Sequence, residues 1–117
     1  MTDIEHMQKE VLAFREARDW KKFHKPKDCV ISLALEAAEV MELLQWRNDE
    51  EIASYRAGGE KHEDMCDELA DVLHWVLLIA HDFGVDLPVA WEHKMKKNHA
   101  KYPVEKARGR HTKYTEL

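Results

Sequence analysis

The sequence predicts an all-α, four-helix-bundle-like domain, and three observations support this prediction. Residues that favour helices, above all Ala, Glu, Lys, Leu and Met, are abundant. Only four Gly and three Pro interrupt the 117 residues. Apolar residues recur at helical spacing, and strand-like alternation is absent. With 44% apolar and 35% charged residues, the chain has the composition and length of one globular domain.

The first predicted helix runs from Thr2 or Asp3 to about Lys21. Its apolar stripe recurs at helical spacing and consists of Ile4, Met7, Val11, Phe14 and Ala17. Pro26 disfavours helical geometry at the residue before it, and Asp28 is predicted to be the N-cap of a second helix that ends near Trp46.

Three further helical segments follow. Asn48, Asp49 and Glu50 are predicted to cap a short helix through Tyr55. A third long helix is predicted from Glu60 to Phe83, ended by Gly84, and a fourth begins at Leu87 and Pro88. The segment after Pro103 lacks a periodic apolar face. The sequence thus predicts a domain over residues 1–103 and a basic tail over residues 104–117, either as an ordered arm or as a disordered one.

Two of these helices carry paired carboxylates beside their apolar faces. Glu36 and Glu39 lie three residues apart in ISLALEAAEVMELLQW, and Glu68 and Asp71 repeat that spacing in DMCDELADVLHWVLLIAHDF. Residues three apart are neighbours on a helix surface, so each pair forms a negative patch at the edge of a core face.

Packing the two apolar faces together would bring the four acids into one cluster. Each close like-charge pair then costs about 3 kcal/mol at an effective dielectric constant of about 20. Such a cluster requires a cation, or some of its carboxyls must stay protonated. Oxygen ligands without thiolates favour Mg²⁺, with Mn²⁺ as a possible substitute, over zinc. The alternative is that all four are solvated boundary residues of amphipathic helices, but two matching pairs favour the metal site.

The connection before the second helix brings Trp20, Phe23 and His24 together. These side chains could form a hydrophobic latch with an exposed imidazole. They could equally provide a stacking surface and a hydrogen-bonding group for a nucleobase.

Charge is distributed unevenly along the chain. From Lys94 to Leu117 there are eight basic and two acidic residues, a net of +6, which leaves −11 for the rest of a chain whose net charge is −5. This asymmetry suits an anionic ligand bridged to an acidic site by metal, and the overall acidity argues against nucleic acid as a partner. No apolar run approaches the roughly 20 residues that span a bilayer, so no membrane association is expected. The polar, acidic start is unlike a signal peptide.

Cys29 and Cys66 form no metal-binding or redox motif, which indicates two reduced, packed thiols in a cytoplasmic protein. Asp71 and His74 resemble half of a di-iron carboxylate site, but a four-helix bundle needs such a motif on each of two helices, and only one is present.

On these residues the chain resembles the MazG-like, all-α nucleoside triphosphate pyrophosphatases, and within them the dCTP pyrophosphatase group. The resemblance covers FREARDWKKFHKPK, LALEAAEVMELLQW, DELADVL and VDLPVAWEHKMKKNHAKYP. Its specificity lies in the combination of the two acidic pairs with the later Lys94, Asn98, Tyr102 and Pro103. Where the group commonly has Asn-Leu and Phe-Gln-Trp, this chain has Asp28-Cys29 and Leu44-Gln45-Trp46, departures that bear on base selectivity.

The resemblance implies a Mg²⁺-dependent hydrolase that splits a (deoxy)nucleoside triphosphate, above all dCTP or a modified dCTP, into the monophosphate and pyrophosphate. The matching metal ligands are Glu36, Glu39, Glu68 and Asp71, of which Glu36 or Glu39 would orient or deprotonate the attacking water. The positions that handle phosphate are Lys94, Asn98, Lys101 and Tyr102, and those that hold the base are Trp20, His24 and Trp46. Phosphoryl transfer depends mainly on charge neutralisation and alignment, which agrees with this arrangement.

Apolar residues off the main stripe of their helices, namely Leu35, Trp75, Leu77 and Leu78, indicate an oligomer, and the family implies a homodimer or homotetramer with the site near a protomer boundary. Three alternatives stay open: a broad-specificity house-cleaning pyrophosphatase, a non-catalytic helical interaction module, and a di-iron or metal-storage bundle.

Overall fold

The structure is a computed structural model that describes all 117 residues, and it divides into two compact units, Met1–Gly84 and Val85–Leu117. The first unit contains α1 (Asp3–Ala17), α2 (Pro26–Leu44), α3 (Asp49–Ser54), the 3₁₀ turn η1 (Tyr55–Ala57) and α4 (Glu60–Asp82). The second contains α5 (Leu87–Lys101), α6 (Val104–Ala107) and the 3₁₀ turn η2 (Tyr114–Glu116). The chain is 75% helical without strands, which confirms the all-α prediction. The predicted division at residue 103 stays a prediction.

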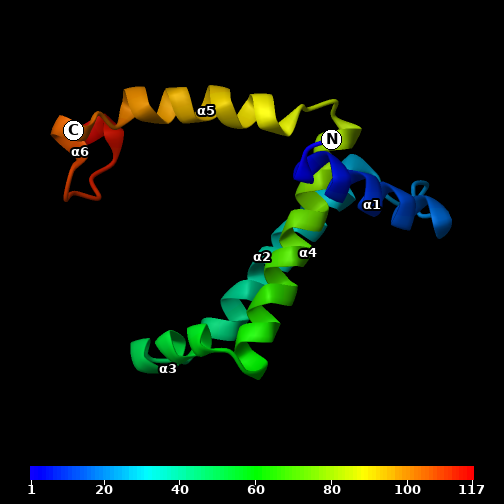
Figure 1. Cartoon of the computed structure of the whole chain (residues 1–117), viewed down its shortest axis with the longest axis horizontal. Coiled ribbons are helices and arrows are strands. Elements are labelled where there is room, and N and C mark those ends of the chain that lie inside the picture. The colour runs from blue at the N-terminus through cyan, green and yellow to red at the C-terminus, as the bar shows by residue number, and fades with distance from the viewer. The chain divides into compact units, whose positions relative to one another are not determined.

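An antiparallel pair of long helices, α2 and α4, forms the body of the first unit, and α1 packs across α4 (Figure 1). α3 and η1 make the connection at the end of the pair where α2 stops. Both long helices are amphipathic, so each covers the apolar stripe of the other.

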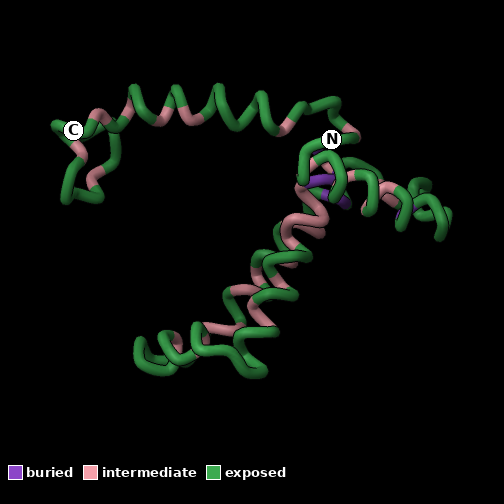
Figure 2. The backbone as a smooth tube through the Cα atoms, viewed as in Figure 1, coloured by how far each residue is buried: buried purple, intermediate pink, exposed green.

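Full burial is confined to the region where α1 meets α4 and the start of α2 (Figure 2). Leu77 and Leu78 are 2% and 0% exposed, and Ala80 and Cys29 are buried with them. The expectation that Leu77 and Leu78 lie on an oligomer surface was therefore wrong, because α1 covers the side of α4 on which they lie. Cys66 is free but exposed, which corrects the expectation that both thiols are packed.

The first helix is shorter than predicted, although it spans the whole predicted apolar stripe. It starts with a reciprocal capping box between Thr2 and Glu5, but it ends at Ala17, four residues before the predicted Lys21. Asp19 has a φ of 53°, a left-handed conformation that a helix cannot continue through. This reversal starts the connecting segment that carries the aromatic residues.

The predicted cap of the second long helix was wrong. α2 begins at Pro26 with Lys25 as its N-cap, so Asp28 lies in the first turn. Proline at the first helical position has a suitable φ and lacks only an N–H that would be unpaired anyway. Asp28 still favours the helix, since a carboxylate in the first turn complements the helix dipole.

The other predicted boundaries hold to within one or two residues. Asn48 caps α3 by accepting a hydrogen bond from the Glu51 N–H. Gly84, with a φ of 65°, follows the end of α4, and Asp86 caps α5 by accepting from Val89.

In the second unit the tail folds back on the end of α5. The rings of Tyr102 and Tyr114 meet edge to face with centroids 5.9 Å apart, and the Lys101 ammonium lies 4.6 Å from the Tyr114 centroid. The tail thus has the form of an ordered arm.

No single helix combines the length and apolar character needed to cross a membrane; α4 and α5 pass that test only when taken together as a bent pair.

Candidate metal centre

The four predicted metal ligands come together between α2 and α4. One carboxylate oxygen from each of Glu36, Glu39, Glu68 and Asp71 lies within 4.8 Å of all the others. The i, i+3 spacing places each pair on one helix face, and packing of the two apolar stripes brings the faces together. Glu36 and Glu68 are half-buried, whereas Glu39 and Asp71 are exposed, so the cluster has a dry side and a solvent side.

Electrostatics in this cluster oppose full ionisation. The pKa of Glu36 is raised, first by burial, then by hydrogen bonding to Glu39 and by the charges of Glu39 and Asp71. Hydrogen bonding from Trp75 acts in the opposite direction. Hydrogen bonding to Glu39, followed by burial and the neighbouring charges, raises the pKa of Glu68 to about 7. Four carboxylates in this space need protons or a cation to compensate their charge.

The donor set fits a divalent cation. Glu36 and Glu68 each have a buried Oε2 without a hydrogen-bond partner, and an unpaired buried oxygen is costly unless a ligand satisfies it. All the available ligand atoms are hard carboxylate oxygens, with no thiolate among them, as Mg²⁺ and Mn²⁺ prefer.

A cavity of about 450 Å³ opens beside this cluster. Asp71 belongs both to the cluster and to the cavity wall, which is completed by Glu10, Val11, Phe14, His74 and Trp75. Half of the lining residues are aromatic: the ring of His74 lies edge-on to those of Phe14 and Trp75, with centroids 5.9 and 5.5 Å away. Sequence reasoning did not assign these aromatic residues to the site. For His74 and Trp75 the available signal was their position one helical turn after Asp71, which places them on the same side of α4, whereas Phe14 reaches the cavity from α1.

Two of the three predicted base-binding residues lie next to this aromatic wall. The ring of His24 packs edge-on against that of Trp75, with centroids 5.2 Å apart. The Trp20 ring centroid lies 6.3 Å from that of His24 and 5.8 Å from that of Phe14. The Nδ1 atom of His24 is buried without a partner. Burial, and next the charge of Arg15, lower the pKa of His24, so its imidazole is kept neutral with one nitrogen free to accept a hydrogen bond.

The third predicted base-binding residue does not join them within the chain. Trp46 follows the end of α2, whereas Trp20 and His24 precede its start, and 19 helical residues span about 28 Å. Trp46 is 90% exposed and has a φ of 67°, so it projects from the turn after α2.

The predicted phosphate-binding residues all lie between the middle of the second unit's long helix and its C-cap. Lys94, Asn98 and Lys101 follow helical spacing on α5, and Tyr102 is its C-cap. Asn98 is half-buried, and its Nδ2 lies 3.9 Å from the Met95 sulfur.

Comparison with known proteins decides the family. A profile of the MazG-like family matches residues 31–117, which includes all four carboxylates and α5. The chain belongs to the MazG-like family. Over 104 residues it is 38% identical to dCTP pyrophosphatase 1 of Bos taurus and of Homo sapiens, an alignment that covers 89% of this chain. The chain spans 62% of the length of the Bos taurus relative and 61% of the human one.

Among solved structures, a pyrophosphatase from Archaeoglobus fulgidus superimposes with a TM-score of 0.78. It is 31% identical to this chain, and the alignment covers 88% of this chain and 94% of the neighbour. The predicted family and fold are confirmed by these matches. The roles of the individual residues stay predictions.

Proposed function

We propose that this MazG-like protein is a metal-dependent nucleoside triphosphate pyrophosphohydrolase that converts dCTP, or a modified dCTP, to the monophosphate and pyrophosphate. The observation that carries the proposal is the convergence of four carboxylate oxygens within 4.8 Å, two of the carboxylates having an unpaired buried oxygen. The relatives named as dCTP pyrophosphatases support the substrate class.

Glu36, Glu39, Glu68 and Asp71 would hold Mg²⁺, for which Mn²⁺ is the natural substitute. When bound, the metal supplies charge neutralisation for the triphosphate and acidifies a water molecule. Glu39 is exposed on the solvent side of the cluster, so it can contact that water, and Glu36 lies one turn away on the same helix face. One of these two carboxylates orients or deprotonates the water that attacks the α-phosphorus.

Binding of the triphosphate is assigned to the basic side of α5. Lys94 and Lys101 contribute ammonium groups that offset negative charge on the departing pyrophosphate, while Asn98 and Tyr102 contribute neutral hydrogen-bonding groups. These residues belong to the same MazG-like match as the acidic cluster.

Binding of the base is assigned to the aromatic cavity beside Asp71. Trp20 and His24 adjoin its wall, and aromatic faces of this kind stack on a pyrimidine. A neutral imidazole at His24 has one acceptor nitrogen, which is suited to accept a hydrogen bond from an exocyclic amine such as that of cytosine.

The active form is proposed to be a homodimer or homotetramer. The hairpin of α2 and α4 leaves large apolar side chains on its surface, Leu35 at 61%, Met41 at 71% and Leu69 at 53% exposure. Because Trp46 is distant from Trp20 and His24 in the same chain, it joins a base site only as a residue of a neighbouring protomer.

The test is to incubate the protein with each dNTP and NTP, 5-methyl-dCTP and dUTP, with and without Mg²⁺, in water enriched in ¹⁸O. We expect monophosphate and pyrophosphate only with Mg²⁺, fastest with cytosine deoxynucleotides, and with the ¹⁸O in the monophosphate because attack is at the α-phosphorus. The same products with another base would overturn the cytosine preference. Equal rates on many nucleotides would favour a broad house-cleaning enzyme, and no turnover would favour an interaction module.

A further inference from the structure

The end of α1 carries an ion pair that neither the metal centre nor the aromatic cavity uses. Arg15 is the one charged residue that is buried, with 5% exposure. Its Nη1 and Nη2 atoms donate to the two carboxylate oxygens of Asp82, at 2.9 and 3.0 Å. Asp82 is the last residue of α4 and only 10% exposed, so the pair joins the C-terminal end of α1 to the C-terminal end of α4.

The backbone of the same arginine holds the connecting segment. The carbonyl of Arg15 accepts a hydrogen bond from the N–H of Trp20 at 3.1 Å. The carbonyl of Trp20 in turn accepts from the N–H groups of Phe23 and His24, at 2.9 and 3.2 Å. The positions of Trp20 and His24 are therefore defined relative to Arg15 through two successive backbone hydrogen bonds.

The other contact of this segment is with the side of α4. His24 packs against Trp75 with centroids 5.2 Å apart, and Trp75 lines the cavity beside Asp71. Trp75 and Asp82 are seven residues apart on α4, so a single rigid helix carries both the aromatic contact and the ion pair. The segment is thus held to α4 directly at Trp75 and, through Arg15, at Asp82, two helical turns further along.

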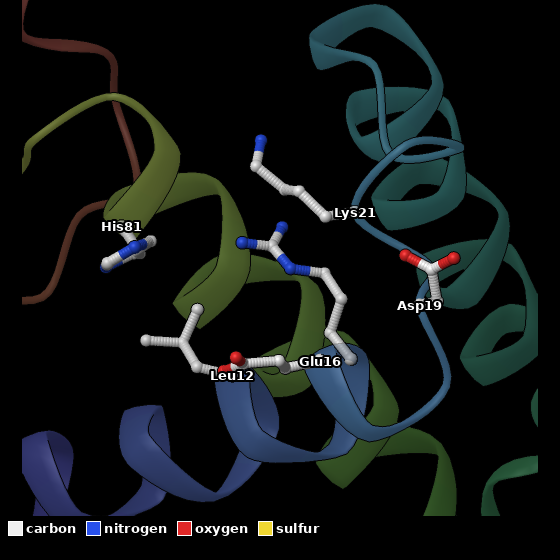
Figure 3. Close-up of a pocket in the computed structure, with 6 residues that line it drawn as sticks. Leu12, Glu16, Asp19, Lys21 and His81 are labelled. Atoms are coloured by element: carbon white, nitrogen blue, oxygen red, sulfur yellow. The ribbon is translucent and has the colours of Figure 1, made fainter.

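Solvent reaches the other side of this ion pair. A cavity of about 480 Å³ adjoins Arg15, and Lys21 extends from the connecting segment toward the end of α4 there (Figure 3). The Lys21 ammonium lies 3.8 Å from Asp82 but is 65% exposed, so it is the weaker partner of that carboxylate. The bidentate contact with Arg15 therefore fixes the orientation of the two side chains relative to each other.

We propose that Arg15 and Asp82 are positioning residues for base recognition, whose buried ion pair fixes the segment with Trp20 and His24 against Trp75. The inference rests on the proposed function and extends it, because it names residues outside the cavity that determine how well the cavity discriminates between bases. Displacing a stacking or hydrogen-bonding group by about 1 Å lowers the catalytic efficiency, kcat/KM, by as much as about 100-fold.

The test compares wild-type protein with R15K, with the double variant R15M/D82L, and with K21M as the matched control. R15K keeps the charge but loses the planar, two-point contact. R15M/D82L replaces both charges with apolar groups, so the variant folds without leaving an unpaired buried charge. K21M removes a cation from the same carboxylate and leaves the buried pair intact.

We expect R15K and R15M/D82L to raise the KM for dCTP about tenfold and to lower the preference for dCTP over dTTP. In both variants kcat should change by less than about threefold, and the Mg²⁺ dependence should be unchanged. Amide hydrogen exchange at Trp20 and His24 should become faster in both variants, and K21M should match wild type in every measurement.

Unchanged KM, unchanged base preference and unchanged exchange in the folded double variant would overturn the inference. A loss of kcat alone, with exchange unchanged, would overturn it too, because it would assign Arg15 to the chemistry. Absence of turnover by the wild-type protein would overturn the proposed function instead, and the exchange measurement would still decide whether the ion pair holds the segment.

Discussion

Glu39 and Glu68 face each other across the pair formed by α2 and α4, and hydrogen bonding between their carboxyls contributes most to raising the pKa of Glu68 to about 7. We therefore expect Glu39 and Glu68 to share one proton near neutral pH in the absence of a cation. We expect a divalent cation bound by these acids to displace this proton, so that the stability of the folded protein depends on both pH and metal.

The first prediction concerns stability in EDTA. The pKa of Glu68 is about 7 in the folded protein against an ordinary value of 4.5, so the folded state keeps a proton that the unfolded chain has lost. The resulting stabilisation is complete below about pH 4.5 and is lost as the pH rises through about 7. We expect the Tm of wild type, relative to that of E68Q, to fall between pH 5 and pH 8, as measured by thermal unfolding.

Mg²⁺ should reverse this loss at pH 8 in the wild type and not in E68Q. The matched control is E63Q, which removes an exposed carboxylate from α4 outside the cluster. Parallel pH profiles of wild type and E68Q in EDTA would show that the acids are independently solvated.

The second prediction concerns the ion pair at the end of α1. Hydrogen bonding from Arg15 lowers the pKa of Asp82 below its ordinary value of 3.8, so this carboxylate stabilises the fold above that value and the contribution is lost as the pH falls through the folded-state pKa. D82N should lower the free energy of unfolding at pH 7 by about 3 kcal/mol, because it leaves Arg15 buried and unpaired.

Urea unfolding of D82N and R15M/D82L measures this effect. The double variant should lie within about 1 kcal/mol of wild type, since apolar groups replace both charges. A D82N protein as stable as wild type at pH 7 would mean that the ion pair orients the connecting segment without stabilising the folded state.

The third prediction concerns assembly. In light scattering at micromolar concentration the protein should have two or four times the chain mass of 13.8 kDa. L35E and M41E each place a charge at an exposed apolar position of α2 and should give monomers, whereas K61E, a charge change at an exposed polar position of α4, should not. A wild-type monomer would contradict the proposed role of Trp46.

The acidic cluster could be predicted from sequence because it depends on helical periodicity and on the packing of two apolar stripes that the same periodicity reveals. Glu36 and Glu39 share one helix face, Glu68 and Asp71 share another, and both faces border apolar stripes that must pack. Most helix ends could be predicted for the same local reason, since Asn48 and Gly84 act through their own backbone and side chains.

Features that depend on packing between distant elements could not be predicted. The first helix was predicted to run to about Lys21, yet it ends at Ala17 and the chain reverses at Asp19, where the ion pair between Arg15 and Asp82 holds the helix end. Burial of Leu77 and Leu78 follows from where α1 crosses α4. The separation of Trp46 from Trp20 follows from the length of α2. The family resemblance placed both residues in one base site without regard to that length.

The most direct test of the central claim is Mg²⁺-dependent turnover of dCTP by wild type, E39Q, D71N and the control E63Q, with folding verified by thermal unfolding. E39Q and D71N each remove one carboxylate from the cluster, and we expect each to lower kcat/KM by at least about 100-fold and to raise the Mg²⁺ concentration needed for half-maximal rate. E63Q should match wild type. Full Mg²⁺-dependent turnover by both E39Q and D71N would contradict the assignment of this cluster as the metal centre.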